Sequence, residues 1–165
     1  MFLPSDARHP TDFDFFIGDW NVRHRRLKRR LVQCADWEQF AGRTNVRQIL
    51  GGSGNVDDNL LHLPDGTYRA ATLRSFDPRS QTWSIWWLDA RNPASLDVPV
   101  VGRFEGTAGT FFAHDHHEGQ PIIVRFLWTA SPEAPRWEQA FSPDRGASWE
   151  TNWVMEFTRR PAEGT

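Results

Sequence analysis

His24 and Gln139 are polar side chains that strand alternation would place among aromatic rings. His24 follows Trp20 at a spacing of four residues, and Gln139 lies midway between Trp137 and Phe141. Residues at even spacing on a strand share one face, so each polar group would project with its neighbouring rings into a common interior. Rings with a few hydrogen-bonding groups are typical of a small-molecule site. Internal hydrogen bonding within a packed core is the alternative for both residues.

Asp89 and several tryptophans extend this set of interior positions. Trp83 and Trp87 share a parity with Asp89, while Trp128 and Trp153 belong to alternating runs with one apolar face. The chain has nine Trp and twelve Phe, and rings line pockets as well as cores. We therefore expect a cavity whose ligand-binding residues are His24, Trp83, Trp87, Asp89, Trp128, Trp137, Gln139 and Trp153.

The same cavity could instead perform acid–base chemistry on an apolar substrate. His24 or Asp89 would serve as the general acid or base, and Arg103 or Arg74 would stabilise a developing oxyanion. Arg103 and Glu105 share a strand face, but periodicity leaves open whether that face is the lumen or the solvent side. An isomerase or a cyclase would be the corresponding enzyme.

The sequence gives weaker support for binding of metal, nucleic acid or haem. The cluster His114–His117 runs straight into turn-forming residues 118–121 and has no further His or Cys at ligand spacing, so we expect no metal site. Basic residues between Arg23 and Arg30 alternate between strand faces and form no continuous stripe for nucleic acid. Haem-binding barrels of the nitrobindin type place an axial histidine near the C-terminus, and no histidine follows His117 here. We expect no cofactor.

The overall composition indicates one compact domain, residues 1–165. A single cysteine, Cys34, excludes an intramolecular disulfide and suits a reducing cytoplasm. The sequence shows neither a signal-peptide pattern nor an apolar run long enough for a membrane helix, so we expect a cytoplasmic protein with no membrane partner. A net charge of −2 gives no general case for binding nucleic acid.

Turn signals recur about every ten residues and predict an all-β fold. We expect strands at 18–30, 37–50, 55–62, 67–76, 82–89, 98–105, 110–116, 122–130, 136–142 and 149–159. Short turns between them predict an antiparallel up-and-down barrel of eight to ten strands, because closure removes exposed edges. A short N-terminal helix within Thr11–Ile17 would cover one end with its rings. In the last strand, alternation would turn Trp149 and Trp153 to the same inner face.

Four longer runs resemble an uncharacterised bacterial family of lipocalin-like barrels, a domain of unknown function. These runs are Phe13–Leu27, Gly102–Gly106, Val124–Trp128 and Trp137–Arg159. The resemblance covers nearly the whole chain and implies a calycin-type barrel with an interior cavity, but no activity. It also implies that Trp20, in the triplet Gly18-Asp19-Trp20, pairs with Arg159 or Arg160 to seal the barrel.

Together these patterns favour a carrier or sensor that binds a small, largely apolar, aromatic molecule in the barrel. The isomerase or cyclase is the alternative from another class. A protein-interaction module, with its working surface outside the barrel, would remain if the rings filled the interior completely. The expected partner is a small apolar ligand, and pairing as a homodimer is left open.

Overall fold

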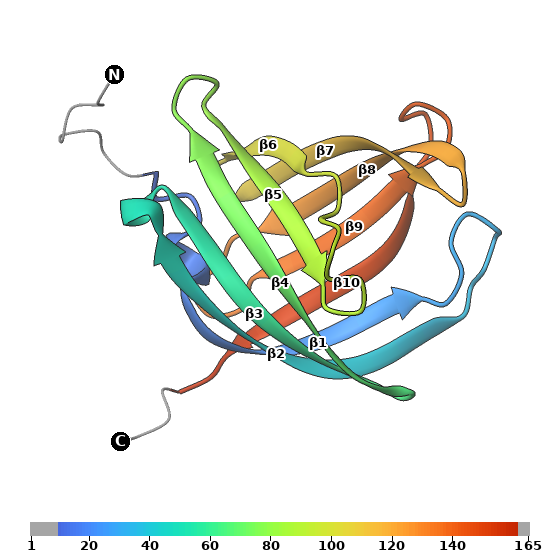
Figure 1. Ribbon diagram of the computed structural model, residues 1–165, viewed down its shortest axis with the longest axis horizontal. Coiled ribbons are helices and arrows are strands. Elements are labelled where there is room, and N and C mark those ends of the chain that lie inside the picture. Colours follow the sequence, from blue (N-terminus) through green and yellow to red (C-terminus); the bar gives the residue numbers. More distant parts are fainter. Residues whose placement is uncertain (1–9, 162–165) are drawn as a thin grey trace.

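Residues 10–161 are described in a computed structural model, in which ten antiparallel strands form one closed barrel (Figure 1). Each strand pairs with its neighbours in the chain, and β1 pairs with β10 to complete the ring. The strands are β1 (Gly18–Leu27), β2 (Trp37–Ile49), β3 (Gly54–Leu63), β4 (Gly66–Asp77), β5 (Thr82–Asp89), β6 (Val100–Glu105), β7 (Ala108–His117), β8 (Gln120–Thr129), β9 (Arg136–Ser142) and β10 (Glu150–Arg159). The predicted all-β barrel is therefore confirmed.

Alternation of side chains explains how the strands build an interior. In β1, Trp20, Val22 and His24 are buried, whereas the residues between them are exposed. Closure leaves no free edge in the described sheet, and every wall strand presents one face to the lumen. Tight turns join β3 to β4, β6 to β7 and β7 to β8, and in the last of these Gly119 takes a φ of 80°, a conformation that costs glycine little.

One end of the barrel is closed by the segment that precedes β1. A 3-10 helix, η1 (Asp14–Phe16), lies there, and the rings of Phe13 and Phe16 are each 2% exposed. Trp20 donates its indole N–H to the carbonyl of Phe16 at 2.7 Å. The Arg159 guanidinium lies 4.1 Å from the centroid of the Trp20 ring. We call this end, formed by η1 and the side chains of Phe13, Phe16, Trp20 and Arg159, the sealed end. It confirms the expected short N-terminal plug. A second 3-10 turn, η2 (Leu50–Gly52), connects β2 to β3.

The opposite end carries the longer connections. The β1–β2 loop and the β5–β6 loop both leave the barrel there (Figure 1). Among residues 10–161, no helix has the length and apolar character needed to cross a membrane.

Three details differ from the sequence-based expectations. β1 ends at Leu27, three residues before Arg30, because the chain turns away from the barrel. β7 runs from Ala108 to His117 and so takes in the whole histidine cluster, beyond the expected strand 110–116, since His114 pairs with Ile123 and His117 with Gln120. A bulge between Thr151 and Trp153 shifts the alternation of β10, so Trp149 lies outside beside Arg125, while Trp153 faces inward.

Candidate functional site

A cavity of about 250 Å³ runs through the barrel interior from the sealed end towards the longer loops. Its apolar wall comes mainly from β5, β8, β9 and β10 and includes Phe16, Ile85, Trp87, Val98, Val100, Val124, Phe126, Trp128, Trp137, Phe141, Trp153, Met155 and Phe157. Small-molecule pockets usually measure roughly 300–1,000 Å³. The cavity is slightly smaller than this range, so its size suits a compact ligand of two or three rings.

Four of the predicted tryptophans surround this space: Trp87, Trp128, Trp137 and Trp153. The Trp153 ring stands nearly perpendicular to Trp137 at 5.6 Å and to Trp87 at 5.7 Å between centroids. Edge-to-face packing holds large rings in fixed orientations, so these side chains form a firm wall. Their predicted part in ligand binding remains a prediction, but their common location is established.

Gln139 also lines the cavity, as its parity indicated. Its side-chain amide donates to Oδ1 of Asn152 at 2.8 Å. Asn152 is the bulged residue of β10 and is fully buried. The bulge therefore supplies a hydrogen-bond partner that orients Gln139, which alternation alone could not predict.

Trp83 lies outside the cavity, which corrects the expectation that it bounds the lumen. Its ring packs edge-on against Phe13 at 5.0 Å, and its indole N–H donates to the carboxylate of Asp12 at 2.9 Å. The predicted inward direction of the Trp83 side chain is correct, but residues that precede β1 fill the barrel at this end. Trp83 therefore anchors the sealed end.

His24 points inward but lies behind the cavity wall, which corrects its expected role as the main polar contact. Its ring stacks on Phe40 at 4.5 Å, and Nδ1 accepts the indole N–H of Trp153 at 3.1 Å. Gly42 faces the ring, where a Cβ atom would come within 2.8 Å of Nε2. Burial, and then the charge of Arg26, lowers the pKa of His24 to about 3. A neutral histidine that orients Trp153 is a poor general base at neutral pH.

Arg103 lies on the outer face of β6, exposed like Glu105, whereas Phe104 packs inward against Phe13. This answers the question that periodicity left open. Because Arg103 points away from the lumen, it cannot stabilise charge on a molecule bound inside the barrel. The expectation that it acts as an oxyanion partner is corrected.

Asp89 lines the cavity at the end of β5 and is held by Arg91. The Arg91 guanidinium donates to both carboxylate oxygens, with a closest distance of 2.7 Å, and stacks 3.6 Å from the centroid of the Tyr68 ring. Hydrogen bonds from Arg91 are the largest cause that lowers the pKa of Asp89. The carboxylate stays ionised and paired, which suits positioning better than proton transfer.

Arg74 belongs to a buried polar network on β3 and β4 that sequence reasoning did not assemble. Its guanidinium donates to Oδ1 of Asn55 at 2.8 Å and to Oδ2 of Asp57 at 2.9 Å. Asp57 also accepts the backbone N–H of Thr72 and the side-chain amide of Asn59. Polar residues at every second position, 55, 57 and 59, indicate a shared strand face. The residues between them are also of mixed polarity, so the sequence does not show which face is inside. Only the register with β4 shows which face is inside.

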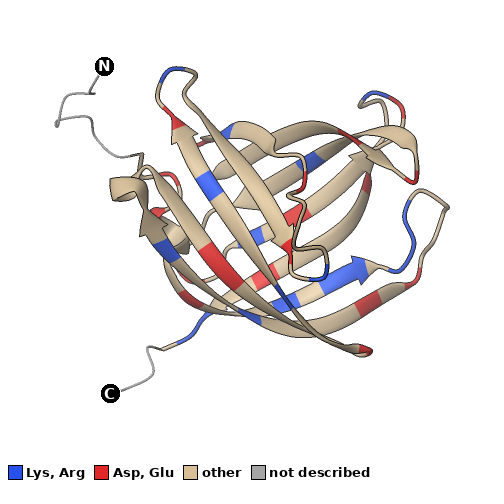
Figure 2. Ribbon diagram, in the orientation of Figure 1, with Lys and Arg blue, Asp and Glu red and all other residues tan. Residues whose placement is uncertain are grey.

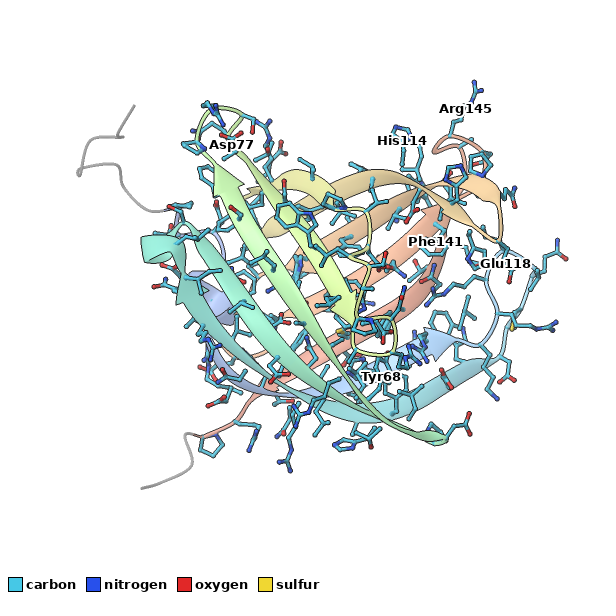
Figure 3. The ribbon with its side chains drawn as sticks, in the orientation of Figure 1. Tyr68, Asp77, His114, Glu118, Phe141 and Arg145 are labelled. Carbon is cyan, nitrogen blue, oxygen red and sulfur yellow. The ribbon has the colours of Figure 1, made fainter. Side chains whose placement is uncertain are left out.

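The end of the cavity away from η1 is rich in charged groups. Arg26 donates to Glu38 at 2.8 Å, and Arg30 lies 5.3 Å from the ring centroid of Phe141. Figure 3 shows Phe141 and Tyr68 on the side of the barrel where the β1–β2 and β5–β6 loops extend. Burial, and then Arg26, lowers the pKa of Arg30 to about 10, which leaves it charged at neutral pH.

Acidic residues contribute to the same end. Asp97 of the β5–β6 loop and Asp115 of β7 both line the cavity. Desolvation, followed by the charges of Asp115 and Asp89, raises the pKa of Asp97. Across the described residues, the lining contains four arginines and four aspartates, so their formal charges cancel. They are Arg26, Arg30, Arg74, Arg91, Asp57, Asp89, Asp97 and Asp115.

The histidines of β7 alternate between the two faces. His114 and His116 are exposed, and Figure 3 shows His114 on the outside of the barrel. Within the described part of the chain, no three His, Cys, Asp or Glu side chains gather in a group that could hold a metal ion. That the protein functions without a bound metal remains a prediction.

The basic residues of β1 divide between the faces as expected. Arg23 is exposed and pairs with Glu156, whereas Arg26 lines the cavity. Figure 2 shows basic segments along the second half of β1 and the following loop, with acidic residues on neighbouring strands. Mixed charge of this kind is not the continuous basic stripe that nucleic acid requires.

Comparisons with known proteins agree with the fold. No protein-family model matches the sequence, and no curated protein matches it. Among solved structures, the S-type phycobiliprotein lyase CPES from Guillardia theta is similar, with a TM-score of 0.61 and 10% sequence identity. The match covers 92% of this chain and 92% of that one. At this identity the likeness shows a shared lipocalin-like barrel, and the particular bacterial family that the sequence resembles remains an expectation.

Proposed function

We propose that this barrel binds a small, neutral, aromatic molecule in its cavity and acts as a carrier or sensor for it. The observation that carries the proposal is the cavity of about 250 Å³ walled by Trp87, Trp128, Trp137 and Trp153. Burying apolar area contributes roughly 25 cal/mol per Å², so a flat aromatic ligand would gain most of its affinity from these rings.

The pairing of charges supports a neutral ligand. Arg74 pairs with Asp57, Arg91 with Asp89 and Arg26 with Glu38, at distances of 2.9, 2.7 and 2.8 Å. A ligand with a buried charge would need its own partner, because an unpaired ion in a protein interior is costly. Most of the charged groups here already have one.

The similar phycobiliprotein lyase supports small-molecule binding in a barrel of this shape and makes a bilin-type compound one ligand to test. The size of the cavity favours a smaller molecule. The isomerase or cyclase has less support, because His24 lies behind Trp153, Asp89 is paired and Arg103 lies outside. Arg74 is the remaining candidate within the lumen.

A titration with N-phenyl-1-naphthylamine, a neutral fluorescent probe, tests the proposal. We expect a saturable rise in probe fluorescence with the wild-type protein. Val124→Trp would fill the cavity from β8 and abolish this rise, whereas Val101→Trp, the same change on an outward position of β6, would leave it intact. Circular dichroism checks that both variants remain folded. Equal binding by both variants would show that the probe binds elsewhere and would refute the proposal.

Pairing as a homodimer stays a separate prediction. Val101 and Phe112 are 41% and 45% exposed on adjacent outward positions of β6 and β7. Sedimentation equilibrium over a range of concentrations would measure the association, and a single monomer mass throughout would contradict it.

A further inference from the structure

Two hydrogen-bond donors in the cavity wall have no partner among residues 10–161. They are the indole N–H of Trp128 and the Nε–H of Arg74. Trp128 is 3% exposed and Arg74 is 4% exposed, and both residues line the cavity. Most buried donors in folded proteins are satisfied, because an unmet one costs about 1–3 kcal/mol. Two such donors in one cavity wall therefore need an explanation.

The two donors belong to the same end of the cavity. The central carbon of the Arg74 guanidinium lies 5.6 Å from the centroid of the Trp128 ring, although the residues come from β4 and β8. Both also contact Phe16, which lies at the sealed end, with Arg74 at 5.2 Å and Trp128 at 4.7 Å from its ring centroid. Both N–H groups are therefore buried on neighbouring side chains at this inner end.

The surrounding side chains offer these donors little else. Phe16 and Phe157 pack against the Trp128 ring, with Phe157 stacked at 5.5 Å. The terminal nitrogens of Arg74 already donate to Asn55 and Asp57, which leaves Nε as the guanidinium nitrogen without a bond. An acceptor for both donors would therefore come from a molecule in the cavity.

We propose that the inner end of the cavity recognises a neutral oxygen acceptor on the ligand, and that the ligand class is an aromatic carbonyl compound. This inference rests on the proposed function and specifies its ligand. Asp57 compensates the charge of Arg74 at 2.9 Å, so a carboxylate would bring an uncompensated negative charge into a buried site. A ketone, aldehyde or quinone oxygen accepts both hydrogen bonds without that penalty.

Three naphthalenes of similar shape test this inference by competition with N-phenyl-1-naphthylamine. In 2-acetylnaphthalene a carbonyl replaces one CH₂ of 2-ethylnaphthalene, and 2-naphthoate carries a carboxylate. We expect the ketone to bind about tenfold more tightly than the ethyl compound, as one well-made hydrogen bond to an otherwise unmet donor allows. The carboxylate should bind more weakly than the ketone.

Trp128→Phe removes the indole N–H and keeps an aromatic ring, so it should reduce the preference for the ketone severalfold. Trp137→Phe is the matched control, because Trp137 also lines the cavity and is 6% exposed. That variant should keep the preference. In the infrared spectrum, the carbonyl stretch of bound ketone should lie at lower frequency in wild type than in Trp128→Phe.

The outcomes separate this inference from the proposed function. Equal affinities for ketone and ethyl compound, or a preference unchanged in Trp128→Phe, would overturn the carbonyl inference and leave aromatic binding intact. Failure of all probes to bind would overturn the proposed function and this inference with it. If Trp128→Phe does not fold, the wild-type infrared spectrum still decides, because an unshifted carbonyl stretch would overturn the inference.

Discussion

Two arginine–tryptophan contacts in this barrel have similar chemistry and different surroundings. At the sealed end, Arg159 lies 4.1 Å from the centroid of Trp20; inside the cavity, Arg74 lies 5.6 Å from that of Trp128. Arg159 donates to the backbone carbonyls of Ile17, Phe15 and Pro132, and the Trp20 indole donates to Phe16. In the cavity pair, one donor on each side chain remains without a partner in residues 10–161.

The difference gives a test for telling a structural contact from the binding contact that we propose. Where every donor meets a backbone carbonyl, the pair ties together segments far apart in the sequence and stabilises the closure of the barrel. Where donors remain unmet beside a cavity, as on Arg74 and Trp128, we propose that a ligand supplies the missing acceptor. Satisfaction of hydrogen bonds, and not residue type, distinguishes the two regions.

The largest expected effect is that of Trp20→Ala at the sealed end. This change removes a fully buried ring and should lower the free energy of unfolding by about 3–5 kcal/mol. Urea denaturation measures it, and Trp149→Ala on the outside of the barrel is the control, with a cost of about 1 kcal/mol. A wild-type midpoint for Trp20→Ala, combined with lost probe binding, would reverse the assignment of the two regions.

His24→Gln extends the comparison to a third tryptophan, Trp153, because His24 accepts the hydrogen bond from the Trp153 indole N–H. The pKa of His24 is lowered from 6.5 to about 3 in the folded protein. Its contribution to stability is therefore complete above about pH 6.5 and is lost as the pH falls towards 3, because the unfolded chain takes up the proton first.

When the pH falls from 7 to 4, the free energy of unfolding should fall in both proteins, but by about 3 kcal/mol less in His24→Gln than in wild type. Urea denaturation at both pH values gives the difference. His62→Gln, a change on the exposed face of β3, should behave like wild type. An unchanged pH dependence in His24→Gln would contradict the neutral, buried state of this histidine.

A smaller effect is expected from Arg159→Lys. Lysine keeps the charge but cannot reach three carbonyls with a planar group, so the free energy of unfolding should fall by about 1–2 kcal/mol. Thermal unfolding would show the loss, and the affinity for N-phenyl-1-naphthylamine should stay the same. Weaker probe binding at unchanged stability would mean that the sealed end takes part in binding.

The smallest effect belongs to Arg103→Ala, because this side chain lies on the outer face. Both probe affinity and stability should remain within about 0.5 kcal/mol of wild type, as for most surface substitutions. Fluorescence titration and urea denaturation measure the two quantities. A marked loss of affinity would place Arg103 at the cavity after all.

The alternation of polar and apolar residues carried most of the information about the fold. The closing contact of Trp20 with Arg159 was expected from the resemblance alone. Strand positions and the inward direction of Trp87, Trp128 and Gln139 follow from period-two spacing and turn chemistry. These features are local, so a single sequence can specify them. The bulge in β10 broke the pattern at Trp149, because an extra residue reverses parity without a clear signal in composition.

The cavity itself was decided by tertiary structure. Parity turned Trp83, Trp128 and His24 inward alike, yet Trp83 meets the plug, His24 lies behind Trp153, and Trp128 lines open space. The network of Arg74 with Asn55 and Asp57 likewise depends on the register of β3 against β4. The sequence by itself determined the order of the strands and the inward direction of most aromatic positions, with Trp149 as the exception and the direction of Arg103 left open. Only the packing of distant segments decided which inward side chains are satisfied by the protein and which face the cavity, because hydrogen-bond partners and empty volume arise from contacts far apart in the chain.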